Sequence, residues 1–169
     1  MKKVILLALA LFSMKVNAQN ILKSCDDMSN ECLYFTDAEL ILANDSKTKG
    51  IKVSPSIEEK DGKIFMSGLI VKMVNIGVCC ENNELIVMFS DSTKATFKSW
   101  NKFNCEGDAY FDVAVSDWSS FFLKPILKIK IENGYTHDSF TGSIKDSSRN
   151  YFINVGKNIL ANKWTKYED

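Results

Sequence analysis

The fold is decided by residues 126–144, which read ILKIKIENGYTHDSFTGSI. Leucine or isoleucine at 127, 129 and 131 alternates there with lysine or glutamate at 128, 130 and 132. This period of two is typical of a strand with one buried face. The Asn133-Gly134 pair that follows predicts a type I′ turn, after which the chain returns over 135–144. These residues therefore predict an antiparallel hairpin.

The same pattern of strand, turn and strand continues upstream of this hairpin. The expected strands are 51–57, 64–74, 85–89, 94–100 and 110–115, with turns at Asp61-Gly62, Asn82-Asn83 and Asp91-Ser92. Pro55 favours an edge position for the first of them, and the nearly continuous apolar run 64–74 indicates a strand covered on both faces. No long helical pattern separates the strands, which argues against a parallel sheet.

The two ends of the chain read differently. Residues 33–35 fit a short strand, 37–42 fit either a helical turn or a second strand, and 44–49 form a polar loop. Near the C-terminus an apolar stripe predicts an amphipathic helix, and Asp146, Ser147 or Ser148 can cap it. The stripe consists of Tyr151, Phe152, Val155, Ile159 and Leu160. We therefore expect a mainly β fold, an antiparallel meander forming a sandwich or a curved sheet, with a C-terminal helix packed on it.

Residues 1–18 have the pattern of a cleavable signal peptide. Lys2 and Lys3 precede an apolar run over 4–12, and Val16-Asn17-Ala18 supplies suitable residues before a cleavage site at Gln19. The run is too short to span a bilayer, and no later segment is long enough to do so. We therefore expect a single β-rich domain over 19–169 that is secreted or periplasmic.

Charge narrows the class of partner. The whole chain has 21 basic and 21 acidic residues. Removing 1–18 takes away three lysines and no acid, which leaves 18 basic against 21 acidic residues, a net charge near −3. Nucleic-acid binding depends on a basic footprint, so nucleic acid is not an expected partner.

All five cysteines lie in the expected mature chain, where export permits disulfides. The preferred pairs are Cys25–Cys32 and Cys80–Cys105, which leaves Cys79 buried and free. Sequence alone does not determine the connectivity, so other pairings stay open.

No catalytic, metal or cofactor motif stands out. His137 is the only histidine and is expected to be structural or exposed, because sequence neighbours on a strand point to opposite faces and do not assemble a triad. A possible ligand surface combines Trp100 and Trp118, both near expected element ends, with Glu106 and Asp108 around Gly107. Aromatic rings beside carboxylates would suit a protein or carbohydrate ligand.

These features favour an exported non-enzymatic binding or interaction domain, with an inhibitor or an immunity-like protein as a special case. One alternative is a small secreted hydrolase that uses a thiol or carboxylates. Another is a structural component of the cell envelope.

Overall fold

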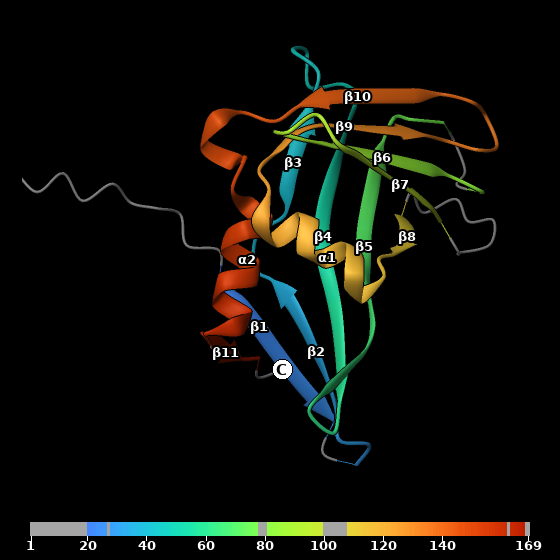
Figure 1. Ribbon diagram of the computed structural model, residues 1–169. Helices are drawn as coiled ribbons and strands as arrows, with labels where there is room; N and C mark the ends of the chain where they lie inside the picture. Colours follow the sequence, from blue (N-terminus) through green and yellow to red (C-terminus); the bar gives the residue numbers. More distant parts are fainter. Residues whose placement is uncertain (1–19, 27, 78–80, 100–107, 162, 168–169) are drawn as a thin grey trace, which may run out of the picture.

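Strands dominate the computed structural model, which describes residues 20–26, 28–77, 81–99, 108–161 and 163–167. The expected signal peptide, 1–18, lies outside the described residues. The described strands form two sheets (Figure 1). All strand pairs are antiparallel except the one between the first and last strands. The prediction of a mainly β, antiparallel fold is therefore confirmed.

The first sheet has the order β11-β1-β2-β4-β5-β8, and β3 pairs with β4 beside this path. Its strands are β1 (Ile21–Asp26), β2 (Glu31–Thr36), β3 (Leu40–Ala43), β4 (Gly50–Lys60), β5 (Lys63–Val74), β8 (Asp108–Asp112) and β11 (Trp164–Lys166). Residues 37–42 thus contribute to a strand rather than to a helical turn. Neither β1 nor β11 was predicted. Their parallel pairing brings the C-terminal end of the described chain beside its start.

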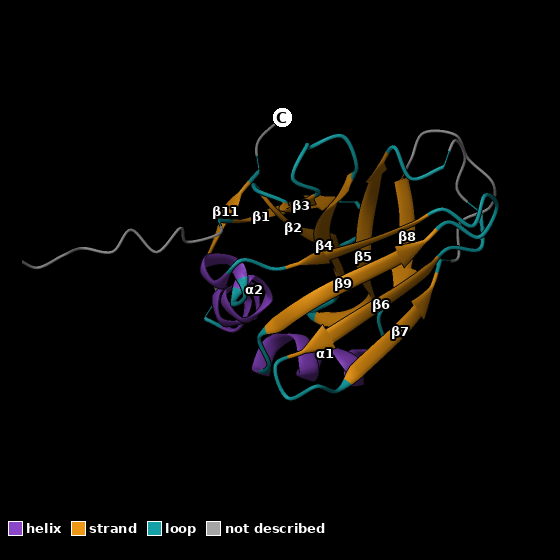
Figure 2. Cartoon of the chain, turned by 90° about the horizontal axis from the view of Figure 1, so that it is seen from above, coloured by secondary structure: helices purple, strands orange, loops and turns teal. Residues whose placement is uncertain are grey.

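The second sheet has the order β10-β9-β6-β7. It comprises β6 (Glu84–Phe89), β7 (Lys94–Lys98), β9 (Ile126–Glu132) and β10 (Ser139–Ser143). Its strands run across those of the first sheet (Figure 1), and the two sheets face each other as layers (Figure 2). An isolated bridge between Ser99 and Phe111 links the β7 and β8 edges, so the sandwich is partly closed on that side.

The core lies between the two sheets and beneath two helices. One continuous cluster of buried residues includes Leu42, Val53, Leu69, Val71 and Phe111 from the first sheet, Leu85, Val87, Phe97, Ile129 and Ile131 from the second, and Phe121, Phe152 and Val155 from the helices. Burial of this apolar surface supplies the main driving force for folding.

The hairpin predicted over 126–144 is present as β9 and β10, and the buried face of β9 differs from the prediction at one position. Ile129 and Ile131 are buried as expected, but Ile126 takes the place expected for Leu127, which is only half-buried. The pairing of β6 with β9 shifts register between Met88 and Phe89. Such a bulge inserts an extra residue and reverses the facing of the side chains beyond it.

The turn of this hairpin is not type I′. Six residues, 133–138, separate β9 from β10, and Gly134 does not have the positive φ that this turn type requires. The buried side chain of Asn133 organises the loop instead. Its Oδ1 accepts hydrogen bonds from the backbone N–H groups of Tyr135 and Thr136, and its Nδ2 donates to the carbonyl of Ile76 at 3.1 Å. By contrast, Asp61 and Gly62 both have positive φ and form the predicted two-residue turn between β4 and β5.

Two expectations for the long central strands are wrong. β4 is not an edge strand, since it pairs with β5 on one side and with β2 and β3 on the other. Pro55 is tolerated because it lies in the interval between the β2 and β3 pairings, where β4 contacts only β5. Strand β5 is not covered on both faces: Leu69 and Val71 are buried, whereas Lys72 and Val74 are exposed.

Helix α1 (Val115–Leu123) was not predicted: a strand was expected over 110–115, and no element was expected over 116–123. Strand β8 ends at Asp112, and the helix follows almost at once. Serine and aromatic residues are only moderate helix formers, so this helix depends on packing. Its buried stripe is Trp118 and Phe121, with the half-buried Phe122 alongside, at the spacing of one helix face.

The predicted C-terminal helix is confirmed as α2 (Tyr151–Leu160). Tyr151, Phe152 and Val155 are buried, whereas Leu160 is exposed at its end. The expected caps are wrong: Asp146–Ser148 form a separate 3-10 turn, and no side chain caps α2. Burial raises the pKa of the Tyr151 hydroxyl, which accepts a hydrogen bond from Thr36 at 2.9 Å and donates to the carbonyl of Ala38 at 2.9 Å.

Gly156 brings α1 and α2 close together. A Cβ atom at this position would lie 2.5 Å from Cγ of Phe122. Because Cγ is the atom that attaches the ring to Cβ, turning the ring would not remove this clash. Gly156→Ala should therefore lower the free energy of unfolding by about 1–2 kcal/mol, because overpacking outweighs the gain of about 1 kcal/mol in helix propensity. Urea denaturation measures this change.

Two further variants make this test specific. Lys157→Ala on the exposed face of α2 should change stability by less than about 0.5 kcal/mol. Gly156→Ala combined with Phe122→Ala should cost less than the sum of the two single changes, since the clash is absent. A stabilising effect of Gly156→Ala alone would show that the helices are not in close contact.

The role of Asn133 can be tested by removing its amide donor. Asn133→Asp keeps an acceptor for the loop N–H groups but loses the bond to the Ile76 carbonyl and buries a carboxyl, so we expect a loss of about 2–4 kcal/mol at pH 7. Burial raises the folded-state pKa of such a carboxyl above its unfolded value of about 3.9. The loss should therefore be smaller at pH 4 than at pH 7. Asn133→Ala, which has no titrating group, should show no such recovery in denaturant titrations at the two pH values.

Candidate functional site

The expected ligand surface is only partly within the described residues. Trp100 and Glu106 lie outside them. Trp118 and Asp108 are described, and they belong to α1 and to the first residue of β8.

Trp118 does not contribute to an exposed ligand surface. Its side chain is 5% exposed, and its ring contacts the rings of Phe121 and Phe122 with centroids 5.2 Å apart in each case. The reason is the helix that the sequence did not reveal: a tryptophan expected at a loop or strand end lies instead on the core face of α1. Its Nε1 atom is buried without a hydrogen-bond partner in the described part of the chain.

Asp108 remains accessible to solvent on the first sheet. Its carboxylate lies 3.8 Å from Nζ of Lys72 on the neighbouring strand β5, and both side chains are partly exposed. Exposed pairs of this kind contribute little to stability. The structure brings no second predicted site residue to Asp108 among those described.

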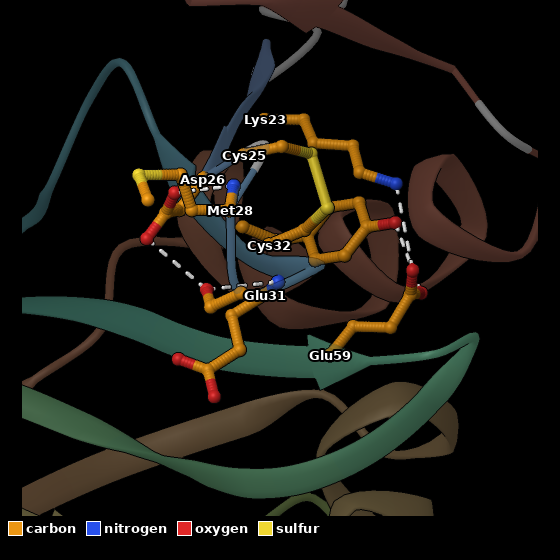
Figure 3. Close-up of a disulfide and its surroundings, with 9 residues drawn as sticks. Lys23, Cys25, Asp26, Met28, Glu31, Cys32 and Glu59 are labelled. Atoms are coloured by element: carbon orange, nitrogen blue, oxygen red, sulfur yellow. Dashed lines mark hydrogen bonds and ion pairs between the residues drawn. A yellow bond between two sulfur atoms is a disulfide. The ribbon is translucent and has the colours of Figure 1, made fainter.

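The disulfide between Cys25 and Cys32 is confirmed (Figure 3). The two residues face each other across β1 and β2, with their Cα atoms 4.1 Å apart. Asp26 orders the turn between them by accepting hydrogen bonds from the Met28 N–H and the Ser29 hydroxyl, and these bonds lower the pKa of its carboxyl. The pair expected between Cys80 and Cys105, and Cys79 as a free thiol, lie outside the described residues.

Lys23 lies beside this disulfide in a cluster that connects four strands. Its ammonium contacts the carboxylate of Glu59 at 3.5 Å and lies 4.8 Å from the ring centroids of both Tyr34 and Trp164. Burial opposes the charge, but Tyr34 and Glu59 outweigh it, so the pKa of Lys23 is raised. All of its polar contacts are internal, which indicates that the cluster stabilises the β11, β1, β2 and β4 end of the sheet.

His137 lies in the loop between β9 and β10. Its side chain is 79% exposed, and its nearest charged partner is Glu132 at 3.9 Å. No group of three or more metal-binding side chains forms among the described residues.

A groove lined by lysines lies at the other end of the first sheet. We define the β3 groove as the free edge of β3, the facing segment 143–145, and the adjoining hollow beneath loop 44–49. The channel between β3 and 143–145 has a volume of about 330 Å³ and is lined by all four residues of β3. The adjoining hollow has a volume of about 630 Å³ and shares Ile41, Leu42, Ala43 and Lys145 with the channel.

Four lysines line the β3 groove: Lys47, Lys49, Lys52 and Lys145. Lys52 is paired with Glu39 at 3.2 Å, and Lys49 donates to the carbonyl of Ser139 at 3.3 Å. Neither Lys47 nor Lys145 has an ion-pair partner within the described ranges. With Asp45 as the other acid at the rim, the groove has an excess of positive charge.

Loop 44–49 is held in place by side-chain amides. Asn44 donates from Nδ2 to the hydroxyls of Ser46 and Thr48, and its Oδ1 accepts from the N–H of Lys49 at 2.9 Å. Asn75 donates to the carbonyl of Thr48 at 2.6 Å from the end of β5. This network positions the Lys47 and Lys49 backbone before any ligand arrives, which lowers the ordering cost of binding.

Sequence reasoning missed this groove. The loop 44–49 was recognised as polar, and its lysines were visible, but Lys145 lies about 100 positions further along the chain. The one usable signal was a short apolar run, 40–43, that ends directly in a lysine-containing loop.

Comparison with known proteins adds no family assignment. No family model, curated protein or solved structure matches the chain.

No helix in the ranges that the structure covers combines the length and apolar character needed to cross a membrane.

Proposed function

We propose that this chain is an exported, non-enzymatic binding module that acts in the periplasm or outside the cell and captures its partner in the β3 groove. The observation that carries the proposal is the preformed groove with two lysines, Lys47 and Lys145, that have no ion-pair partner among the described residues. The mature form of the chain is expected to be acidic. An uncompensated local charge of this kind favours a ligand of opposite sign.

The disulfide and the N-terminal sequence support the location. Disulfides persist mainly in oxidising compartments, and the Cys25–Cys32 bond is of the structural kind that bridges two paired strands. An inhibitor or immunity-like role would be one form of such binding, in which the captured group belongs to a target protein.

Export is tested by altering the expected cleavage site. When the full chain is produced in a bacterium, the processed protein should begin at Gln19. Ala18→Arg should leave the precursor uncut, because a small residue is needed just before the cleaved bond. Asn17→Arg, at the tolerant middle position, should still be processed. N-terminal sequencing of the extracytoplasmic fraction distinguishes the outcomes, and a wild-type chain that stays in the cytoplasm unprocessed would refute export.

Binding through the groove is tested by charge reversal. The tagged, processed protein is incubated with the extracytoplasmic fraction of cells that make it, and we expect a partner to be retained in stoichiometric amount. Lys47→Glu with Lys145→Glu should reduce retention at least about tenfold, the effect of losing about 1.4 kcal/mol.

The matched control is Lys94→Glu with Lys128→Glu, which reverses two exposed lysines on the second sheet. This variant should retain the partner as the wild type does. Equal retention by all three proteins would show that the groove is not the binding site.

A further inference from the structure

We infer that the ligand of the β3 groove is an extended peptide segment with acidic side chains, which adds as a further strand to the free edge of β3. This inference rests on the proposed binding function and specifies the chemistry of the partner.

The backbone of β3 offers an unpaired edge of known register. The N–H of Asn44 donates to the carbonyl of Lys49 at 2.9 Å, which makes these residues a hydrogen-bonded pair. In an antiparallel ladder such pairs alternate with non-hydrogen-bonded ones. The pairs 42–51 and 40–53 are therefore hydrogen-bonded, whereas 41–52 and 43–50 are not. It follows that the N–H and C=O groups of Ile41 and Ala43 point away from β4.

No described strand pairs with this side of β3. The other edges in the described sheets are less available. β7 and β8 meet through the Ser99–Phe111 bridge, Lys49 contacts the β10 edge at Ser139, and β11 has only three residues. An unpaired edge is a template for an additional strand.

The channel beside β3 runs along this edge. Besides the residues of β3, it is lined by 143–145, which include Lys145. Ile41 is 65% exposed on the outer face of the sheet, where alternate side chains of an added strand would also lie. An apolar surface and unpaired backbone groups thus occur at the same place.

The positive charge of the lysines determines which kind of peptide the groove favours. Side chains of an added strand would approach Lys47 and Lys145, which lack acidic partners among the described residues, so carboxylates are the complementary groups. A second copy of this chain would place the same lysines near their counterparts, and lysines at an edge oppose such pairing. Charge therefore favours a peptide of a different protein.

The test uses the processed protein and a capped peptide of seven alternating valine and glutamate residues, with binding followed by calorimetry or fluorescence anisotropy. We expect binding that weakens as salt is added. The same peptide with lysine in place of glutamate should bind at least about tenfold more weakly. Equal affinity of the two peptides would overturn the selection by charge.

Two substitutions of Ile41 separate strand addition from attraction between charges. Ile41→Pro removes the N–H that faces the free edge, and β4 does not use this group, so the fold should be kept. It should reduce the affinity for the acidic peptide at least about tenfold. Ile41→Thr keeps the N–H and the branched Cβ, and it should bind within about threefold of the wild type.

A peptide variant covers the case in which Ile41→Pro does not fold. The acidic peptide with alternate backbone nitrogens methylated keeps its charge but cannot donate to the edge, so it should lose binding to the wild-type protein. Full binding of this peptide, or of the acidic peptide to a folded Ile41→Pro protein, would overturn strand addition.

The remaining outcomes are also decisive. Failure of the acidic peptide to bind, together with partner retention that depends on Lys47 and Lys145, would refute this inference and leave the proposed function standing. If the acidic peptide fails to bind and partner retention also does not depend on Lys47 and Lys145, both the inference and the proposed function are refuted. A wild-type dimer that Ile41→Pro converts to a monomer would show that the occupant is a second copy.

Discussion

The contact between α1 and α2 is the interaction on which the rest of the structure depends. Two sheets whose strands cross leave an open end, and the aromatic rings of the two helices fill it: the ring of Phe121 lies 5.5 Å from that of Phe89 in the second sheet and 5.2 Å from that of Phe152 in α2. The approach is possible because Gly156 has no side chain to meet Phe122. The buried hydroxyl of Ser67 donates to the Val113 carbonyl at 2.8 Å and thereby fixes where α1 leaves the first sheet.

This dependence explains why the sequence revealed the strands better than the helices. Alternation at 127–132 is a property of neighbouring residues, so the β9–β10 hairpin could be predicted locally. Helix α1 could not, because its serines and aromatic residues have little helical preference of their own and its apolar stripe is buried by a second helix about 30 positions later. The expectation that β5 is covered on both faces failed for the same reason, because coverage depends on elements far away in the sequence. Val74 is apolar but exposed, since nothing in the described chain covers the outer side of β5.

The candidate site was beyond sequence reasoning for a similar reason. Trp118 appeared available because its helix was not recognised. The β3 groove requires Lys47 and Lys145 to line one hollow beside a short strand, and Lys145 reaches it only because the second sheet packs on the first. Close approach is again necessary: a Cβ at Gly142 in β10 would lie 3.1 Å from Cβ of Leu42 in β3. The signal-like N-terminus and the cysteines predict an exported protein, which is a prediction about its location and not about its site.

The short length of β3 limits how binding at its edge can work. Two residues face the edge, so an added strand gains at most about four backbone hydrogen bonds, worth about 1 kcal/mol each. A total of about 4 kcal/mol corresponds to millimolar affinity, before the cost of ordering the peptide. Backbone pairing alone therefore cannot hold a partner. Affinity and selectivity must therefore come from the side chains beside the edge. Loop 44–49 contributes because the amides of Asn44 and Asn75 hold the Lys47 and Lys49 backbone in position before the partner arrives.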